Sequence, residues 1–242
     1  MSHIGKYLRY HLRSLAFRNT YVRRAVLHGA SKFSHSKRGS SKEYWDLALG
    51  GELKTYLGGT VSIDSRNALV AVLIDHYAPA IPCVLDIGCA GGSLARILKC
   101  YSKYLGVDIS SLAAEQARQD PKNLEAVRDG KMEYVASDMC ELSLETAPKW
   151  DVILFNEVLY YLTVEEAVRQ VARYCATLRE GGIVCVSMKD DGKAHAVFDC
   201  LAREYTWKEG LLWQSKIAGP DYRIGINRER PAYLLAALAP RA

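Results

Sequence analysis

The stretch VLDIGCAGGSLA, residues 84–95, decides the fold of this 242-residue chain. A short apolar run ends at Asp86, and three glycines, Gly88, Gly91 and Gly92, follow within six residues. This pattern predicts a buried strand, a turn with bare backbone, and a helix over residues 93–100. A ligand can approach such a turn closely, and a helix that starts there offers free N–H groups to it.

The rest of the chain from about residue 62 alternates between strand and helix patterns. We expect strands at 81–88, 104–108, 132–137, 150–156 and 183–188. Helices are expected at about 62–77, from Ser110 to before Pro121, from the Thr163-x-x-Glu166 capping box to Gly181-Gly182, and at 193–204. This alternation predicts an α/β fold with a mostly parallel sheet covered on both faces. Three β-like runs follow at 211–217, 222–227 and 232–238, of which two should pair antiparallel at the sheet edge.

An acid at the tip of the second strand marks the ligand site more closely. Asp108 lies 22 residues beyond Asp86. A carboxylate at this place can accept hydrogen bonds from both hydroxyls of a ribose. Because parallel strands end at one edge, Asp86, Asp108 and the glycine turn should converge on one crevice at the topological switch point.

The stretch 84–95 resembles motif I of the Rossmann-like, S-adenosylmethionine-dependent methyltransferases. The resemblance continues in order through YLGVDIS (104–110), YVASDM (134–139), WDVILFNEVLYYL (150–162) and GGIVCVSM (181–188). It covers residues 60–188 and the strand-rich tail, and it implies a doubly wound, seven-stranded sheet with an antiparallel C-terminal edge. Ala90 departs from the pattern, since the family more often has glycine there, and we expect a local backbone adjustment without loss of binding.

The resemblance implies S-adenosylmethionine as cofactor, with contacts from eleven residues. They are Asp86, Gly88, Cys89, Ala90, Gly91 and Gly92 at the methionine part, Asp108 and Ile109 at the ribose, Asp138 and Met139 beside the adenine, and Asn156 bordering the methyl group. A solvated loop acid remains the alternative for Asp108, and a helix cap the alternative for Asp138. No metal site is expected.

Methyl transfer to a hydroxyl or an ammonium requires a base, and the sequence offers several. Glu157 follows the fourth strand, where relatives bind their acceptor, and His195 is the second candidate; Asp190 and Asp191 are weaker ones. His195 equally suits a packed or solvated helix residue.

Aromatic residues lie near both ends of the expected acceptor site. Tyr160 and Tyr161 could wall the acceptor or belong to the core. Tyr44 and Trp45, in EYWD at 43–46, resemble the aromatic lid segment of small-molecule methyltransferases, with a staple between linker and domain as the alternative.

Other protein classes are disfavoured by missing motifs. A dinucleotide-binding dehydrogenase would want G-x-G-x-x-G, and Ala90 replaces its middle glycine. There is no [DN]-P-P-[YF] run, Walker motif, H-E-x-x-H or G-x-S-x-G. Seven cysteines without C-x-x-C spacing argue against a disulfide framework and a zinc ribbon.

The positive charge is concentrated at the N-terminus. Residues 1–42 hold ten of the 32 Lys and Arg residues and no acid, so the net charge of +5 hides an acidic body. A basic amphipathic helix over residues 4–15 and a Ser/Gly/Lys linker at 28–42 predict an extension that precedes a methyltransferase domain at 43–242. The extension suits an anionic membrane surface or, less well, nucleic acid, and its composition also matches an organelle transit peptide.

These patterns together predict a methyltransferase acting on an oxygen or nitrogen of a small molecule. The stretch FNEVLYYL (155–162) resembles bacterial enzymes that act on sugars and nodulation-type oligosaccharides, so a sugar or glycan acceptor is favoured. An RNA-binding methyltransferase that uses the basic arm and a non-catalytic cofactor-binding partner subunit are the alternatives. We expect a cytoplasmic protein with peripheral membrane contact through residues 1–42.

Overall fold

The computed structural model describes residues 42, 45–46, 61–144, 149–214 and 232–241. All of them belong to the unit Ser41–Ala242. The basic extension up to residue 41, Tyr44 and the β-like run at 222–227 lie outside the described residues. No helix in the described part of the chain combines the length and hydropathy needed to cross a membrane.

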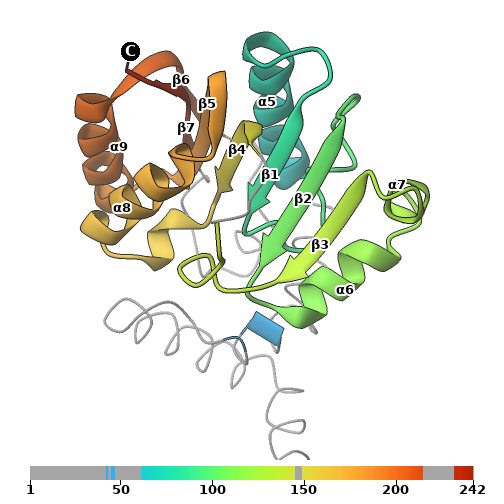
Figure 1. Ribbon diagram of the computed structural model, residues 1–242. Helices are drawn as coiled ribbons and strands as arrows, with labels where there is room; N and C mark the ends of the chain where they lie inside the picture. The colour runs from blue at the N-terminus through green and yellow to red at the C-terminus, as the bar shows by residue number, and fades with distance from the viewer. Residues whose placement is uncertain (1–41, 43–44, 47–60, 145–148, 215–231, 242) are drawn as a thin grey trace, which may run out of the picture. The chain divides into compact units, whose positions relative to one another are not determined.

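Seven strands form one sheet at the centre of the domain (Figure 1). They are β1 (Cys83–Ile87), β2 (Lys103–Asp108), β3 (Met132–Ala136), β4 (Trp150–Asn156), β5 (Leu178–Lys189), β6 (Tyr205–Gln214) and β7 (Ala232–Pro240). Their order is β3-β2-β1-β4-β5-β7-β6; the first five are parallel, and β7 runs antiparallel to β5 and β6. The order reverses between β1 and β4, which is therefore the switch point where α/β proteins bind ligands.

Helices cover both faces of the sheet, as the alternating pattern predicts. The helices are α5 (Val61–Tyr77), α6 (Ser111–Gln119), α7 (Leu124–Arg128), α8 (Val164–Cys175) and α9 (Gly192–Glu204), with a short 3-10 helix η1 (Leu159–Tyr161). Buried side chains of α8 and α9 pack on one face of β1, β4 and β5. Those of α5 and α6 pack on the opposite face. Successive strand residues alternate between these two cores, so neither face of the central strands reaches water.

Side-chain caps fix where three helices begin. The hydroxyl of Ser110 accepts a hydrogen bond from the N–H of Ala113, and that of Thr163 accepts one from Glu166. Asp191 caps α9 through the N–H of Ala194. Each cap satisfies a donor that the first turn would leave unpaired. The predicted starts of α6 and α8 are confirmed.

The helix predicted at residues 93–100 is wrong, because this segment is a run of turns. One oxygen, that of Leu94, accepts from the N–H groups of both Ile97 and Leu98, at 2.9 and 3.3 Å. The glycine turn also uses its own donors internally, since Gly88 and Cys89 both donate to the oxygen of Val107. The glycine turn is therefore not followed by a regular helix N-terminus.

The predicted end of the helix after Thr163 is also wrong. The helix α8 ends at Cys175, six residues before Gly181, and β5 already begins at Leu178. The two glycines instead lie where the register of β4 and β5 shifts, and Gly181 has φ +75°. A glycine that terminates a helix and one that forms a bulge both take positive φ, so the letters alone do not separate them.

The antiparallel pair predicted for the tail is confirmed as β6 and β7. The strand β6 starts at Tyr205, directly after α9 and six residues before the predicted run at 211–217. Its register against β7 shifts between Trp207 and Glu209, which makes a bulge in the outermost strand.

Candidate active site

The loops that follow β1 and β4 touch at Gly88. Gly88 has φ +77°, and a Cβ placed on it would lie 2.8 Å from the Cβ of Val158. Any larger residue would push the two loops apart. Gly88 therefore brings the end of β1 against the residues after β4, at the switch point of the sheet.

Ala90 takes a left-handed backbone with φ +47°, which a glycine would adopt freely. An alanine in this conformation costs roughly 1–2 kcal/mol. Its N–H donates to Oδ2 of Asp108 at 2.9 Å, a bond to a buried carboxyl that helps to hold the strained turn. The local backbone adjustment expected at Ala90 is thus a left-handed residue held by Asp108.

Asp108 ends β2 and is 9% exposed. Besides Ala90, the N–H of Ser110 donates to its other oxygen, Oδ1, at 2.8 Å. Burial raises the pKa of Asp108, while the two backbone donors oppose that shift and the charge of Asp46 adds to it. Each carboxylate oxygen keeps a second lone pair, so Asp108 remains able to accept from a ribose hydroxyl.

Asp86, near the end of β1, is almost fully buried and only partly satisfied. The hydroxyl of Tyr104 donates to its Oδ2 at 2.5 Å, whereas Oδ1 is buried without a hydrogen-bond partner. Burial raises the pKa of Asp86 to about 6; the Tyr104 bond and the charge of Arg66 lower it, and Asp108 raises it. A buried oxygen without a donor indicates the place of a cationic or donor group of a ligand.

Arg66 of α5 is a site residue that the sequence analysis missed. It is 7% exposed, and its Nε is also buried without a hydrogen-bond partner. Its guanidinium lies over the ring of Tyr233, 5.1 Å from the centroid, and one terminal nitrogen is 3.9 Å from Oε2 of Glu157. Within the apolar pattern of residues 61–77, nothing distinguishes this arginine from one on the solvent side.

The orphaned atoms of Asp86 and Arg66 fit the methionine end of S-adenosylmethionine. That end carries an ammonium and a carboxylate on one carbon, and the site offers one buried acid and one buried guanidinium, each with one atom that lacks a hydrogen-bond partner. The Arg66 charge acts on Asp86, so the two groups lie within electrostatic reach. The residues present therefore fit the cofactor, with Asp86 for the ammonium and Arg66 for the carboxylate.

The segment after β3 holds the residues expected beside the adenine. Oδ1 of Asp138 accepts from the N–H of Cys140 at 2.8 Å and so closes its own turn. The oxygen of Met139 accepts from Tyr174 and from Arg173, both on α8. Asp138 thus shapes the loop, as the helix-cap alternative implies, and its place beside an adenine stays a prediction.

The other predicted loop residues occupy the same edge of the sheet. Cys89 is buried, whereas Gly91 and Ile109 are partly exposed, and a Cβ on Gly91 would meet nothing within 4 Å. These positions leave room at the turn that Asp86 and Asp108 flank.

Asn156 ends β4, Glu157 follows it, and both lie mostly inside the protein. The carboxamide of Asn156 donates to Oδ1 of Asn67 at 3.0 Å and accepts from the hydroxyl of Ser187 at 2.6 Å. The same hydroxyl lies 3.1 Å from Oε1 of Glu157. The side chain of Asn156 is thus hydrogen-bonded to other protein side chains. The sequence analysis had placed it beside the methyl group of the cofactor and did not predict these bonds.

Glu157 combines an unusual backbone with a perturbed charge. Its φ is +62°, and its N–H donates to the oxygen of Ser187 at 3.0 Å. Burial raises the pKa of Glu157, and Arg66 and Ser187 partly offset that shift. Non-glycine residues with this backbone are enriched at functional sites.

The structure does not bring His195 to Glu157. The His195 side chain is 61% exposed on the first turn of α9, and its Nε2 is 2.8 Å from Oδ1 of Asp190. Asp191, by contrast, is the N-cap of α9 and acts on the Glu157 charge. Glu157 is therefore the better placed of the two predicted bases.

The aromatic residues predicted near the acceptor form one cluster. The hydroxyls of Tyr160 and Tyr161 are 3.0 Å apart, and their ring centroids are 4.3 Å apart. Trp45 packs edge-on against Tyr161 at 5.1 Å. The segment before the domain thus contacts the loop after β4.

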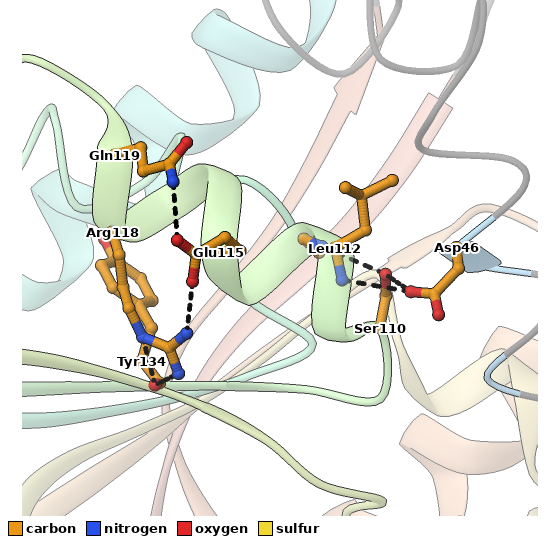
Figure 2. A network of polar contacts seen from close by, with 8 residues as sticks. Asp46, Ser110, Leu112, Glu115, Arg118, Gln119 and Tyr134 are labelled. Atoms are coloured by element: carbon orange, nitrogen blue, oxygen red, sulfur yellow. Dashed lines mark hydrogen bonds and ion pairs between the residues drawn. The ribbon is translucent and has the colours of Figure 1, made fainter.

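Asp46 is a second residue that the sequence analysis missed. Its Oδ1 accepts from the hydroxyl of Ser110 at 2.5 Å and from the N–H of Leu112 at 3.1 Å, as Figure 2 shows. An acid is favourable at the first turn of a helix. Trp45 and Asp46 therefore contact the two halves of the site, after β4 and after β2.

Comparison with known proteins finds one family match and several curated relatives. Residues 84–182 match the family described as "Methyltransferase domain". Nodulation protein S of Azorhizobium caulinodans is 33% identical over 87 residues, which are 36% of this chain and 38% of that protein. Ubiquinone biosynthesis O-methyltransferase of Bordetella avium is 30% identical over 125 residues, 50% of this chain and 48% of that one. The match spans less than half of the length of each relative.

Two solved structures share the fold over most of the chain. The N-methyltransferase NodS of Bradyrhizobium japonicum WM9, in complex with S-adenosylhomocysteine, has a TM-score of 0.65 at 19% identity and covers 83% of this chain and 98% of its own. The magnesium protoporphyrin IX methyltransferase of Synechocystis PCC 6803 has a TM-score of 0.62 at 14% identity, over 82% and 97%. Residues 84–182 thus match a family of methyltransferase domains, and the chain around them shares its fold with Rossmann-like methyltransferases.

Proposed function

We propose that this protein transfers a methyl group from S-adenosylmethionine to an oxygen or nitrogen of a small molecule, with a sugar or glycan favoured. One observation carries the proposal: Asp86 and Arg66, opposite in charge and each with an unpartnered buried atom, lie at the switch point beside Glu157. Asp86 and Arg66 together suit an amino acid zwitterion as ligand, and Glu157 is suited to accept a proton.

The bound cofactor supplies a methyl group that its sulfonium has already activated. The protein then has to align an acceptor with that group, exclude water and take one proton. Glu157 is suited to the last task, because burial raises its pKa toward the range in which a carboxylate is an effective base. Asp108 and the turn that it holds through Ala90 fix the cofactor side.

The acceptor class is argued from the aromatic cluster and from the relatives. Tyr160, Tyr161 and Trp45 offer ring faces and hydroxyls together, the mixed surface that binds a flat molecule with polar edges. The solved structure named as an N-methyltransferase NodS supports a nitrogen acceptor. The relative named as a ubiquinone biosynthesis O-methyltransferase supports an oxygen acceptor.

Replacement of Asp108 tests the cofactor site. We expect Asp108→Ala to weaken S-adenosylhomocysteine binding by about 1.5–3 kcal/mol, the value of hydrogen bonds to a charged group. Isothermal titration calorimetry measures this loss directly.

Asp108→Asn is the matched control, because an amide keeps one oxygen that can accept from Ala90. If loop anchoring alone mattered, the asparagine variant would bind normally. Tight NAD binding with no binding of S-adenosylhomocysteine would overturn the assignment.

A transfer screen tests the activity itself. We expect label from S-adenosyl-[methyl-³H]methionine to enter a glycan or metabolite pool when the full chain is present. Label in RNA would favour the RNA methyltransferase. Cofactor binding without transfer to any pool would favour a non-catalytic subunit.

Residues 1–42 carry a separate prediction about location. This segment contains ten basic residues and no acid. Each basic residue near an anionic bilayer contributes about 1 kcal/mol to the free energy of membrane binding. We expect the full chain to sediment with vesicles that contain phosphatidylserine, and a chain lacking residues 1–42 to stay in the supernatant with its cofactor affinity intact. RNA binding with a steep salt dependence and no vesicle binding would refute the membrane hypothesis.

A further inference from the structure

A chain of buried polar side chains runs from the glycine turn to Glu157. The carboxamide of Asn67 donates to Oγ of Ser93 at 3.1 Å, and Asn156 donates to Oδ1 of Asn67 at 3.0 Å. Ser187 connects Asn156 to Glu157, at 2.6 and 3.1 Å. Asn67 and Ser187 are 0% and 1% exposed, so these two members of the chain are shielded from water. The chain links α5, the glycine turn, β4 and β5.

The direction of this chain determines what Glu157 can do. Ser187 has a single hydroxyl proton, and Asn156 offers it an oxygen because its amide nitrogen is engaged by Asn67. With that proton given to Asn156, Ser187 has only lone pairs left for Glu157. In this direction every bond is satisfied when Glu157 carries a proton and donates it to Ser187.

The opposite direction is also complete. If both carboxamides turn over by 180°, Ser93 donates to Asn67, Asn67 to Asn156, and Asn156 to the oxygen of Ser187. Ser187 then gives its proton to Glu157, which accepts it as a carboxylate. One direction therefore matches neutral Glu157 and the other matches ionised Glu157, because a mixed chain leaves a buried donor or acceptor unpaired.

We propose that Asn67 and Ser187 are positioning residues that set the proton occupancy of Glu157 through this hydrogen-bond chain, whose direction reverses when Glu157 loses its proton. The inference rests on the proposed function, in which Glu157 takes the acceptor proton. Ser93 lies at the other end, just past the glycine turn, so the reversal also reaches the cofactor side.

Other charged and titratable groups face Glu157 and set the background for the chain. Arg66 of α5 and Lys189 of β5 favour its ionised form, and Asp191 before α9 opposes it. Tyr160 of η1 is also in electrostatic contact with Glu157. None of these groups belongs to the chain, so variants of Asn67 and Ser187 leave them in place.

Two variants should move the titration of Glu157 in opposite directions. Ser187→Ala removes the donor to the carboxylate, so the midpoint should rise by about 0.5–1 pH unit. Asn67→Leu removes the partner of Asn156 in both directions: it orphans an amide N–H when Glu157 is neutral and a carbonyl oxygen when Glu157 is ionised. Because an orphaned buried donor is the less tolerated of the two, the midpoint should fall. The ¹³C side-chain carboxyl resonance of Glu157, assigned with Glu157→Gln, reports the midpoint in the full chain.

Thr177→Val is the matched control. It removes another buried hydroxyl, which donates to the oxygen of Tyr174 at 2.7 Å and has no part in the chain, and it should leave the Glu157 midpoint unchanged. Shifts of the same sign in both variants, or no shift, overturn the inference.

The free protein and the protein with S-adenosylhomocysteine are both titrated, and calorimetry on the same samples measures cofactor affinity. A wild-type protein that does not bind S-adenosylhomocysteine would overturn the proposed function. The midpoints in the free protein would still decide the role of the chain.

Discussion

Glu157→Gln is expected to lower the turnover number by roughly 10²- to 10⁴-fold, the range for loss of a general base. The amide retains the shape of the side chain, and its oxygen can still accept from Ser187. It has no lone pair basic enough to take a proton from the acceptor. Because Glu157 does not belong to the group assigned to the cofactor, the affinity for S-adenosylhomocysteine should remain nearly unchanged. Single-turnover kinetics with an active acceptor measure the first quantity and calorimetry the second.

His195→Gln is the comparison variant, because it removes the other predicted base without changing Glu157. Its side chain is exposed and paired with Asp190, so we expect its turnover within a few-fold of the wild type. A normal rate in Glu157→Gln would reduce Glu157 to a lining residue and leave alignment as the source of catalysis.

Asp86→Asn is expected to make the protein more stable at neutral pH and much weaker in cofactor binding. Burial raises the pKa of Asp86 to about 6, whereas an unfolded chain holds an aspartate near 3.9. The folded state therefore binds the Asp86 proton more tightly than the unfolded state does. The corresponding stability is fully present below about pH 4 and is lost as pH rises through about 6, so ionised Asp86 costs about 2–3 kcal/mol at pH 7.

Thermal unfolding of both proteins at pH 4 and pH 7.5 tests this expectation. The variant should exceed the wild type in free energy of unfolding at pH 7.5, with a smaller difference at pH 4, where the charge is absent in both. S-adenosylhomocysteine should raise the melting temperature of the wild type and hardly move that of Asp86→Asn, because the ammonium has lost its carboxylate. A variant that is less stable at pH 7.5 would show that Asp86 is a structural anchor.

The sequence predicted the parts of the fold that depend on local pattern. The strand at 150–156 appears with the predicted bounds, because seven mostly apolar residues buried on both faces leave no ambiguity about where it ends. The glycines at 181 and 182 were misread, since a bulge between β4 and β5 depends on the partner strand. The turn at 93–100 has a helical apolar spacing but only one helical hydrogen bond.

The residues of the site likewise divide into those that a local motif predicts and those that depend on tertiary packing. Asp86, Asp108 and the glycine turn lie within 25 residues and carry a motif. Arg66 and Asn67 reach the site only through the packing of α5 on the sheet, and Asn67 bonds Asn156 across 89 residues of sequence. The period of a helix tells which residues share a face, but it does not tell which polar residue on the buried face meets a ligand.

The bulge in β6 affects how copies of the protein behave at high concentration. Within the described residues β6 is the last strand of the sheet, and a long regular edge strand is a template for pairing with another molecule. The shift between Trp207 and Glu209 interrupts the regularity of this strand, and Lys208 and Glu209 place charges there. Polymerisation by edge-to-edge strand addition is thereby disfavoured at the side of the sheet farthest from β3.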